Sequence, residues 1–206
     1  NTVSVLRNQG AGTFAGAVTY VSGNTPLAVA MADINGDGKV DIVTANFGAN
    51  NLAVLLNQGG GNFAAAVTYG YYTGARTVGA ADLNGDGLAD LVAGGGADIA
   101  VYLNLGNGKF MGNVVYPAGA TTNSVALADL DGDGKRDIVV VDYGAQEYAT
   151  VLFNKGAGVF GAPVRYGAGR QSNAVTAGDF NGDGRSDLAV CSLADKSVAV
   201  LLNRCW

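Results

Sequence analysis

The stretch from Asp33 to Asp41 reads DINGDGKVD, and it decides the fold of this chain. Side chains with carboxylate or amide oxygens stand at its first, third, fifth and ninth positions, and glycine stands at the fourth and sixth. The stretch returns as DLNGDGLAD from Asp82, DLDGDGKRD from Asp129 and DFNGDGRSD from Asp179, at steps of 49, 47 and 50 residues. A fixed period of this length indicates a repeat architecture.

A second signature keeps the same period. It has the form Asn-x-Gly-x-Gly-x-Phe and occurs as NQGAGTF from Asn8, NQGGGNF from Asn57, NLGNGKF from Asn104 and NKGAGVF from Asn154. Two signatures that stay in step define one repeated unit rather than two coincidences.

Between these landmarks lie short apolar runs rich in Val, Leu and Ile, four to a unit, which are too short and too β-branched to predict helices. Around the first acidic stretch they are LAVAMAD, DIVTAN, LAVLLN and AVTY, which predict strands A, B, C and D over 27–33, 41–46, 52–57 and 66–69. Four strands in each repeat predict an all-β fold, a β-propeller of four-stranded antiparallel blades that forms one domain over residues 1–206. A β-sandwich has similar turn spacing but no reason to repeat at this period.

The ends of the chain are out of phase with the blades. Strand C occurs five times, first as VSVLRN over 3–8 and last as VAVLLN over 198–203, whereas A, B and D occur four times. The pattern fits a closed four-bladed ring whose first residues complete the last blade, or half of a larger ring made by two copies or cut from a longer protein. In the closed ring one C strand is left over, and an unpaired strand offers an edge for self-association.

Each acidic stretch supplies the ligands that a hard divalent cation requires, oxygens from alternate residues of a curled backbone. Glycine at the fourth and sixth positions permits the curl because it takes positive φ without penalty. Oxygen-only ligation favours Ca²⁺ over magnesium or manganese. We therefore expect about four calcium sites, with the seventh residue of each loop contributing its carbonyl. The expected ligands are Asp33, Asn35, Asp37, Lys39 and Asp41; Asp82, Asn84, Asp86, Leu88 and Asp90; Asp129, Asp131, Asp133, Lys135 and Asp137; and Asp179, Asn181, Asp183, Arg185 and Asp187.

An alternative reading takes Asn-Gly-Asp-Gly as an ordinary hairpin turn. However, 13 of the 17 acidic residues lie in these four stretches, and a turn needs no such concentration of like charge. We expect the ions to be structural, and the chain to lose most of its thermal stability in chelator.

Composition narrows the function classes. The net charge of -5 argues against a nucleic-acid binder, which needs a Lys/Arg footprint, and no apolar run approaches the length of a membrane-spanning helix. The chain has no His, so an enzyme would have to work without imidazole. Asp142 and Glu147 lie close in sequence, but no nucleophile or second-site carboxylate pairs with them, and we expect no catalysis. Because the first residue is Asn1 rather than Met, we expect a processed or trimmed form that has lost an export signal.

Units of this form resemble the FG-GAP/VCBS repeat family, whose calcium loops also occur in the propeller of integrin α-subunits. The resemblance covers essentially the whole chain, and all four loops match at every ligand position. It implies a secreted or cell-surface β-propeller with a calcium loop between the first two strands of each blade. Adhesion, protein binding and carbohydrate binding are the roles that it suggests, and it fixes no ligand.

The loops between B and C and between D and A share the disc face opposite to the acidic loops, and they differ among the repeats. Variable loops on a rigid repeat scaffold usually carry specificity. The ligand-binding candidates are aromatic, charged or amide residues, although an ordinary solvated loop is the better explanation for any one of them taken alone: Tyr71, Tyr72, Arg76, Tyr143, Gln146, Glu147, Tyr148, Arg170 and Gln171.

These loops favour an adhesion, protein-binding or assembly module with a protein or glycan partner on the variable face. A calcium-dependent lectin is the second reading, since tyrosine and amide groups can bind sugars.

Cys191 is expected at the end of a B strand and Cys205 beyond a C strand, roughly 15 to 20 Å apart at ~3.3 Å per residue. A disulfide needs closer Cα atoms, so we predict no Cys191–Cys205 bridge.

Overall fold

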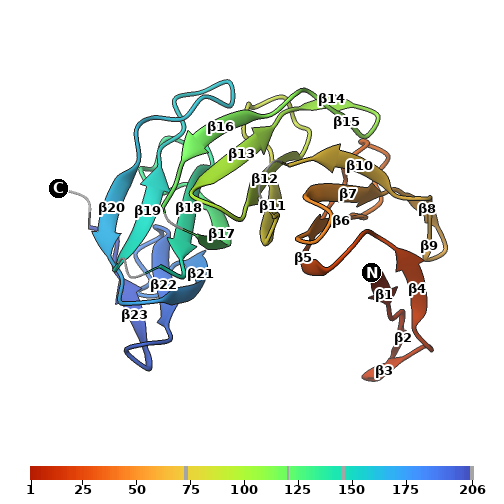
Figure 1. Cartoon of the computed structure of the whole chain (residues 1–206), viewed down its shortest axis with the longest axis horizontal. Helices are drawn as coiled ribbons and strands as arrows, with labels where there is room; N and C mark the ends of the chain where they lie inside the picture. The colour runs from red at the N-terminus through yellow and green to blue at the C-terminus, as the bar shows by residue number, and fades with distance from the viewer. Residues whose placement is uncertain (72–73, 120, 145–146, 205–206) are drawn as a thin grey trace.

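The structure is a computed structural model that describes residues 1–71, 74–119, 121–144 and 147–204. Within these residues the regular structure is β throughout, and the sheets stand side by side in an arc (Figure 1). The described residues include no helix long and apolar enough to cross a membrane. The predicted all-β propeller architecture is confirmed.

Three sheets are complete antiparallel blades with the strand order A, B, C, D. Blade 1 consists of β5 (Pro26–Ala32), β6 (Asp41–Asn46), β7 (Asn51–Leu55) and β10 (Val67–Gly70). Blade 2 consists of β11 (Thr77–Ala81), β12 (Asp90–Gly94), β13 (Asp98–Tyr102) and β16 (Val114–Pro117). Blade 3 consists of β17 (Thr122–Ala128), β18 (Asp137–Asp142), β19 (Tyr148–Leu152) and β20 (Val164–Gly167).

The two ends of the arc are incomplete blades. The N-terminal half-blade pairs a C strand, β1 (Thr2–Val5), with a D strand, β4 (Val18–Val21). Blade 4 has A, B and C strands, β21 (Ser172–Gly178), β22 (Asp187–Ser192) and β23 (Ser197–Leu201). Both terminal C strands are therefore paired, and neither lies loose.

The arc is open. The half-blade, red in Figure 1, and blade 4, blue, lie at opposite ends with a gap between them. The closed four-bladed ring is thus not formed. The observed shape matches the other arrangement that the sequence leaves open, part of a larger ring.

The Asn-x-Gly-x-Gly-x-Phe signature forms a small hairpin between strands C and D, which the sequence pattern alone does not reveal. The hairpins are β2 (Asn8–Gly10) with β3 (Thr13–Phe14), β8 (Asn57–Gly59) with β9 (Asn62–Phe63), and β14 (Asn104–Gly106) with β15 (Lys109–Phe110). In blade 3 a single bridge joins Asn154 to Phe160 at the same place.

The hydrophobic core lies between the blades, because alternate residues of each strand point to opposite faces of its sheet. In β12, Leu91 and Ala93 pack toward blade 1, whereas Val92 packs toward blade 3. A third cluster joins blades 3 and 4. The B strands β6, β12 and β18 are consequently buried on both faces, and their ends hold the acidic loops in fixed positions.

Candidate metal centre

Each acidic stretch is the connection between strands A and B of one blade. Its ninth residue begins strand B directly opposite the last residue of strand A, as in the pairs Ala32–Asp41, Ala81–Asp90, Ala128–Asp137 and Gly178–Asp187. The four loops thus leave their blades in the same register.

The first aspartate closes the curl of each loop. In the first loop, Asp33 Oδ1 accepts a hydrogen bond from the Gly36 N–H at 2.8 Å, and Asp33 Oδ2 accepts one from the Gly38 N–H at 2.7 Å. Gly36 and Gly38 have φ of 74° and 81°, values that favour glycine. Asp82, Asp129 and Asp179 accept the same two bonds in their own loops. The backbone N–H groups that donate to Asp179 lower the pKa of this carboxyl, and the Gly184 N–H contributes most.

The ninth aspartate is buried in every loop. Asp90 Oδ2 accepts from the Leu83 N–H at 2.8 Å, and Asp90 Oδ1 accepts from the Asn104 N–H at 2.7 Å. Asp41, Asp137 and Asp187 make the equivalent pair of bonds. Burial raises the pKa of Asp90 and Asp137. Burial destabilises the charged form of a carboxylate, and a positive charge nearby stabilises that form.

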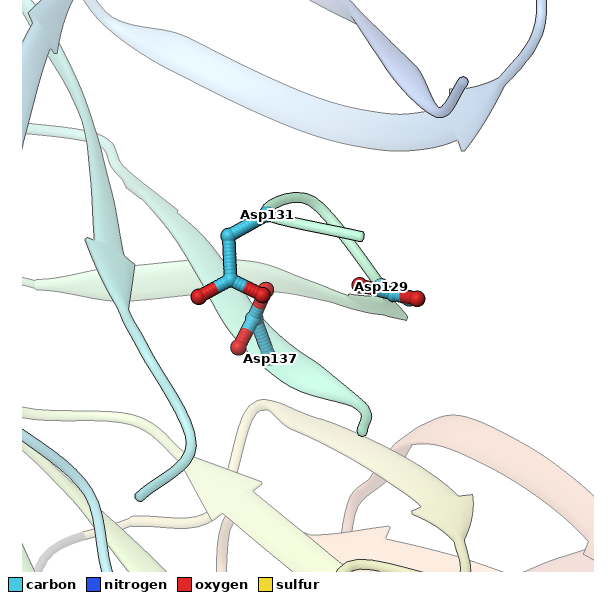
Figure 2. Close-up of side chains that lie close together, drawn as sticks. All are labelled: Asp129, Asp131 and Asp137. Atoms are coloured by element: carbon cyan, nitrogen blue, oxygen red, sulfur yellow. The ribbon is translucent and has the colours of Figure 1, made fainter. Parts of the chain in front are cut away.

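The third loop brings its carboxylates together most clearly. One oxygen each from Asp129, Asp131 and Asp137 lies within 4.8 Å of the others. Figure 2 shows Asp129 and Asp131 on the loop and Asp137 on the strand that follows, with the carboxylates of Asp131 and Asp137 turned toward each other. Three carboxylates at this spacing fit a hard divalent cation, which takes oxygen ligands at about 2.3–2.6 Å.

The seventh side chain has a role that the sequence analysis did not assign. Lys39 Nζ lies 2.9 Å from Asp37 Oδ2, and the equivalent ion pairs are Lys135–Asp133 and Arg185–Asp183. The lysine partners lower the pKa of Asp37 and Asp133, and Asp133 raises that of Lys135. These cations offset part of the repulsion among the loop carboxylates. The second loop has Leu88 instead and lacks such a cation.

In blades 2 and 3, the first residue of the hairpin signature ties neighbouring loops together. Besides donating its N–H to Asp90, Asn104 donates through Nδ2 to the Ala89 carbonyl at 2.9 Å and to the Ile34 carbonyl of the preceding loop at 2.8 Å. Asn154 makes the same bridge to the Leu83 carbonyl, and Asn203, at the equivalent position after β23, makes it to the Leu130 carbonyl. The shared period of the two signatures was the signal that could have predicted this contact.

The variable-loop candidates do not form one site. Tyr71 is a core residue, 2% exposed, whose hydroxyl donates to the Asp98 carbonyl, so its prediction as a ligand contact is wrong. Arg76 stacks over the Phe47 ring at 4.6 Å. Arg170 pairs with Asp195 at 2.8 Å. Gln171, the next residue, has φ of 53° and accepts the Leu193 N–H at its carbonyl.

Three candidates remain exposed on the surface. Tyr143, Glu147 and Tyr148 are exposed, and they flank the connection between β18 and β19. Tyr72 and Gln146 lie outside the described residues, as does Cys205. Cys191 is a free, exposed cysteine in β22.

The chain is similar to known proteins in sequence and in structure. The sequence model of the FG-GAP-like repeat matches residues 1–44, 33–93, 82–140 and 129–190. A search of curated protein sequences found no match.

Solved structures resemble the chain over most of its length. A lectin from Agrocybe aegerita, described as recognising non-reducing terminal N-acetylglucosamine, is 25% identical with a TM-score of 0.66, over 98% of this chain and 57% of the lectin. The V. cholerae biofilm matrix protein Bap1 is 26% identical with a TM-score of 0.55, over 85% of this chain and 26% of its own. The chain therefore spans little more than half of the lectin and about a quarter of the matrix protein.

Proposed function

Because this chain belongs to the FG-GAP-like repeat family, we propose that it is a calcium-stabilised β-propeller serving as an extracellular or cell-surface adhesion, protein-binding or assembly module. The observation that carries the proposal is the acidic loop, repeated four times with one hydrogen-bond pattern. The similarity to a biofilm matrix protein supports a place outside the cell.

The residues that would hold calcium are the side chains at the first, third, fifth and ninth loop positions together with the seventh carbonyl. The bound ion would supply positive charge that neutralises these carboxylates. The ninth aspartate links the ion site to the next blade contact. Asp90 accepts a hydrogen bond from the Asn104 N–H, and Asn104 Nδ2 donates to the Ile34 carbonyl of the preceding blade. Ion binding therefore stabilises the contact between blades as well as the loop.

Mass action sets the scale of the effect. Free calcium at 100 times the dissociation constant stabilises the folded state by ~2.7 kcal/mol per site. Several such sites together reach the 5–15 kcal/mol that is typical of a whole domain.

Isothermal titration of the chelator-treated chain tests the proposed ion. We expect about four calcium ions per chain, as the four loops imply, with weaker binding of magnesium. Asp86→Asn should remove or weaken one site, whereas Asp195→Asn, which changes a carboxylate outside the loops, should leave the stoichiometry unchanged. Absence of calcium binding in the unaltered chain would refute the proposal.

Carbohydrate binding is the second candidate function, favoured by the similarity to the N-acetylglucosamine-specific lectin. Tyr143 and Tyr148 are exposed rings that could stack on a sugar. Against this candidate, a multivalent lectin would be expected to repeat its pocket in each blade, and the variable loops here differ.

Titration with an oligosaccharide ending in N-acetylglucosamine distinguishes the two candidates. A lectin is expected to bind it in calcium, with at least tenfold weaker binding for Tyr143→Ala or Tyr148→Ala. The exposed Leu105→Ala change in blade 2 serves as the control. If the unaltered chain does not bind the sugar, the protein-binding module stands alone.

A further inference from the structure

Asparagine followed by glycine occurs four times in the chain, and in this dipeptide the side-chain amide is lost most easily, because glycine has no Cβ to hinder attack by its nitrogen. Three copies occupy the third and fourth positions of acidic loops, Asn35–Gly36, Asn84–Gly85 and Asn181–Gly182. The other copy, Asn107–Gly108, lies at the tip of the blade 2 hairpin, between β14 and β15. The four copies share one chemistry in two different surroundings.

Loss of the amide needs no reagent other than water. The glycine nitrogen attacks the side-chain carbonyl carbon of the asparagine, and the new N–C bond closes a succinimide ring. The bond from that carbon to Nδ2 breaks, and ammonia leaves with the proton of the glycine nitrogen. Water then opens the ring at either carbonyl. Breaking the new bond gives aspartate, whereas breaking the original peptide bond gives isoaspartate, in which the main chain runs through the side-chain carbons.

In the acidic loops the reacting groups are held by hydrogen bonds. The attacking nitrogen of Gly36 donates its N–H to Asp33 Oδ1 at 2.8 Å. The amide of Asn35 is held at both of its atoms, since Nδ2 donates to Asp37 Oδ2 at 3.2 Å and Oδ1 accepts the Asp37 N–H at 3.1 Å. The second and fourth loops repeat these three bonds. Ring closure has to break them, so the closed loop opposes the reaction.

The hairpin copy has none of these restraints. Asn107 is exposed, and in the part of the chain that the structure describes neither its side-chain amide nor the Gly108 N–H makes a hydrogen bond. Asn107 is therefore an internal reference for an asparagine that no acidic loop protects.

The third loop indicates what each product does to a metal site. It has Asp131 where the other loops have asparagine, and its Gly132 N–H still donates to Asp129 Oδ1 at 2.8 Å. Aspartate at the third position is thus compatible with the closed loop. Isoaspartate is not, because a longer main chain displaces the glycine N–H groups that the first aspartate accepts. The reaction therefore either adds a carboxylate to a site or destroys the site.

We propose that Asn35, Asn84 and Asn181 are self-modification sites, which convert to aspartate or isoaspartate when their loops open and stay intact while calcium holds the loops closed. The protection by calcium rests on the proposed function, since it requires the ion to bind these loops. A reaction that needs local opening proceeds in proportion to the population of the open state. Free calcium at about 100 times the dissociation constant lowers that population by about 100-fold. A chain deprived of calcium thus loses sites that returning calcium does not restore.

Peptide mapping by mass spectrometry follows each asparagine separately, because the reaction replaces an amino group by a hydroxyl group. The chain is incubated at mildly alkaline pH in calcium and in EGTA, at a temperature where it stays folded in both. The three loop asparagines are expected to convert at least about tenfold faster in EGTA, whereas the rate at Asn107 should change less than about twofold. In concentrated urea, all four asparagines should convert at similar rates.

Two variants test the contribution of the loop itself. Asp33→Ala removes the acceptor of the Gly36 N–H and should speed conversion of Asn35 in calcium at least about tenfold, with the rate at Asn84 unchanged. Asp195→Ala removes a carboxylate outside the loops and should leave every rate unchanged. Loop asparagines that convert equally fast in calcium, EGTA and urea would overturn the inference. A rate at Asn35 that ignores Asp33→Ala would overturn it as well.

Calorimetric titration of the same samples separates this inference from the proposed function. If calcium binds but does not slow the conversion, the inference fails and the proposed function stands. If calcium does not bind, the proposed function fails, and the comparison of the folded chain with the chain in urea still decides whether closed loops protect their asparagines. A chain kept in EGTA until its loop asparagines have reacted should bind fewer calcium ions afterwards, and an undiminished number would contradict the predicted loss of sites.

Discussion

The asparagine that opens the hairpin signature in blades 2 and 3 contributes more than its place in a turn implies. Asn154 Nδ2 donates to the Arg136 carbonyl of its own blade and to the Leu83 carbonyl of the preceding one, and Asn154 is buried. Removing one partner from a buried hydrogen bond leaves the other unsatisfied. This residue couples two acidic loops through a single side chain.

Asn154→Ala should therefore destabilise the chain by about 2–4 kcal/mol, since two buried carbonyls lose their donor. Asn8→Ala is the matched control, because Asn8 occupies the same signature position in the half-blade and is exposed. Urea unfolding in calcium measures both variants. Equal losses would contradict the role assigned to Asn154.

Asp195 predicts a dependence of stability on pH. The Arg170 N–H, then its guanidinium and the Ser192 hydroxyl, lower the pKa of this carboxyl in the folded chain. Its stabilising contribution is therefore present above the unfolded pKa of about 3.9 and is lost as the pH falls through the folded value. Urea unfolding in chelator at a series of pH values measures this dependence. As the pH falls from 5 to the folded pKa of Asp195, the free energy of unfolding of Asp195→Asn should decrease less than that of the unaltered chain. The same loss in both would contradict the assignment.

At the scale of the element, the third acidic loop differs from the others. It has Asp131 at the third position, where the other loops have Asn35, Asn84 and Asn181. A further carboxylate brings charge that a divalent cation favours. The third loop should accordingly bind calcium most tightly.

Asp131→Asn should weaken calcium binding at the third loop by roughly tenfold, because it removes one charge from the ligand set. The reverse change in the first loop, Asn35→Asp, should strengthen binding there by a similar factor. Calorimetric titration of both variants measures the change. Unchanged affinity in both would show that the third position does not contact the ion.

An aromatic contact between blades is also an element-scale feature. Phe110→Ala should destabilise the chain by about 2 kcal/mol, because it removes a partly buried ring and its edge-to-face contact with Tyr69. Phe14→Ala changes the equivalent exposed ring and should be nearly neutral for the chain. Thermal unfolding at low protein concentration compares them, and similar losses would contradict this account.

At the scale of the whole molecule, the repeat period was sufficient to predict the blades. It predicted the strands A to D and the loops between A and B, because each depends on local pattern and turn chemistry. It did not predict that the arc stays open, since curvature depends on how Val78 and Ala80 pack across one blade interface and Val125 and Leu127 across the next. Tyr71 was misread for a similar reason, because its burial comes from contact with blade 2.

The central proposal is that divalent cations on the acidic loops hold the blades together. Thermal unfolding of the unaltered chain in 1 mM calcium and in excess EGTA tests it directly. At ~2.7 kcal/mol per site, we expect the melting temperature to be at least about 10 °C higher in calcium, since 1 kcal/mol shifts a domain of this size by roughly 2–4 °C. The same melting temperature in both solutions would contradict it.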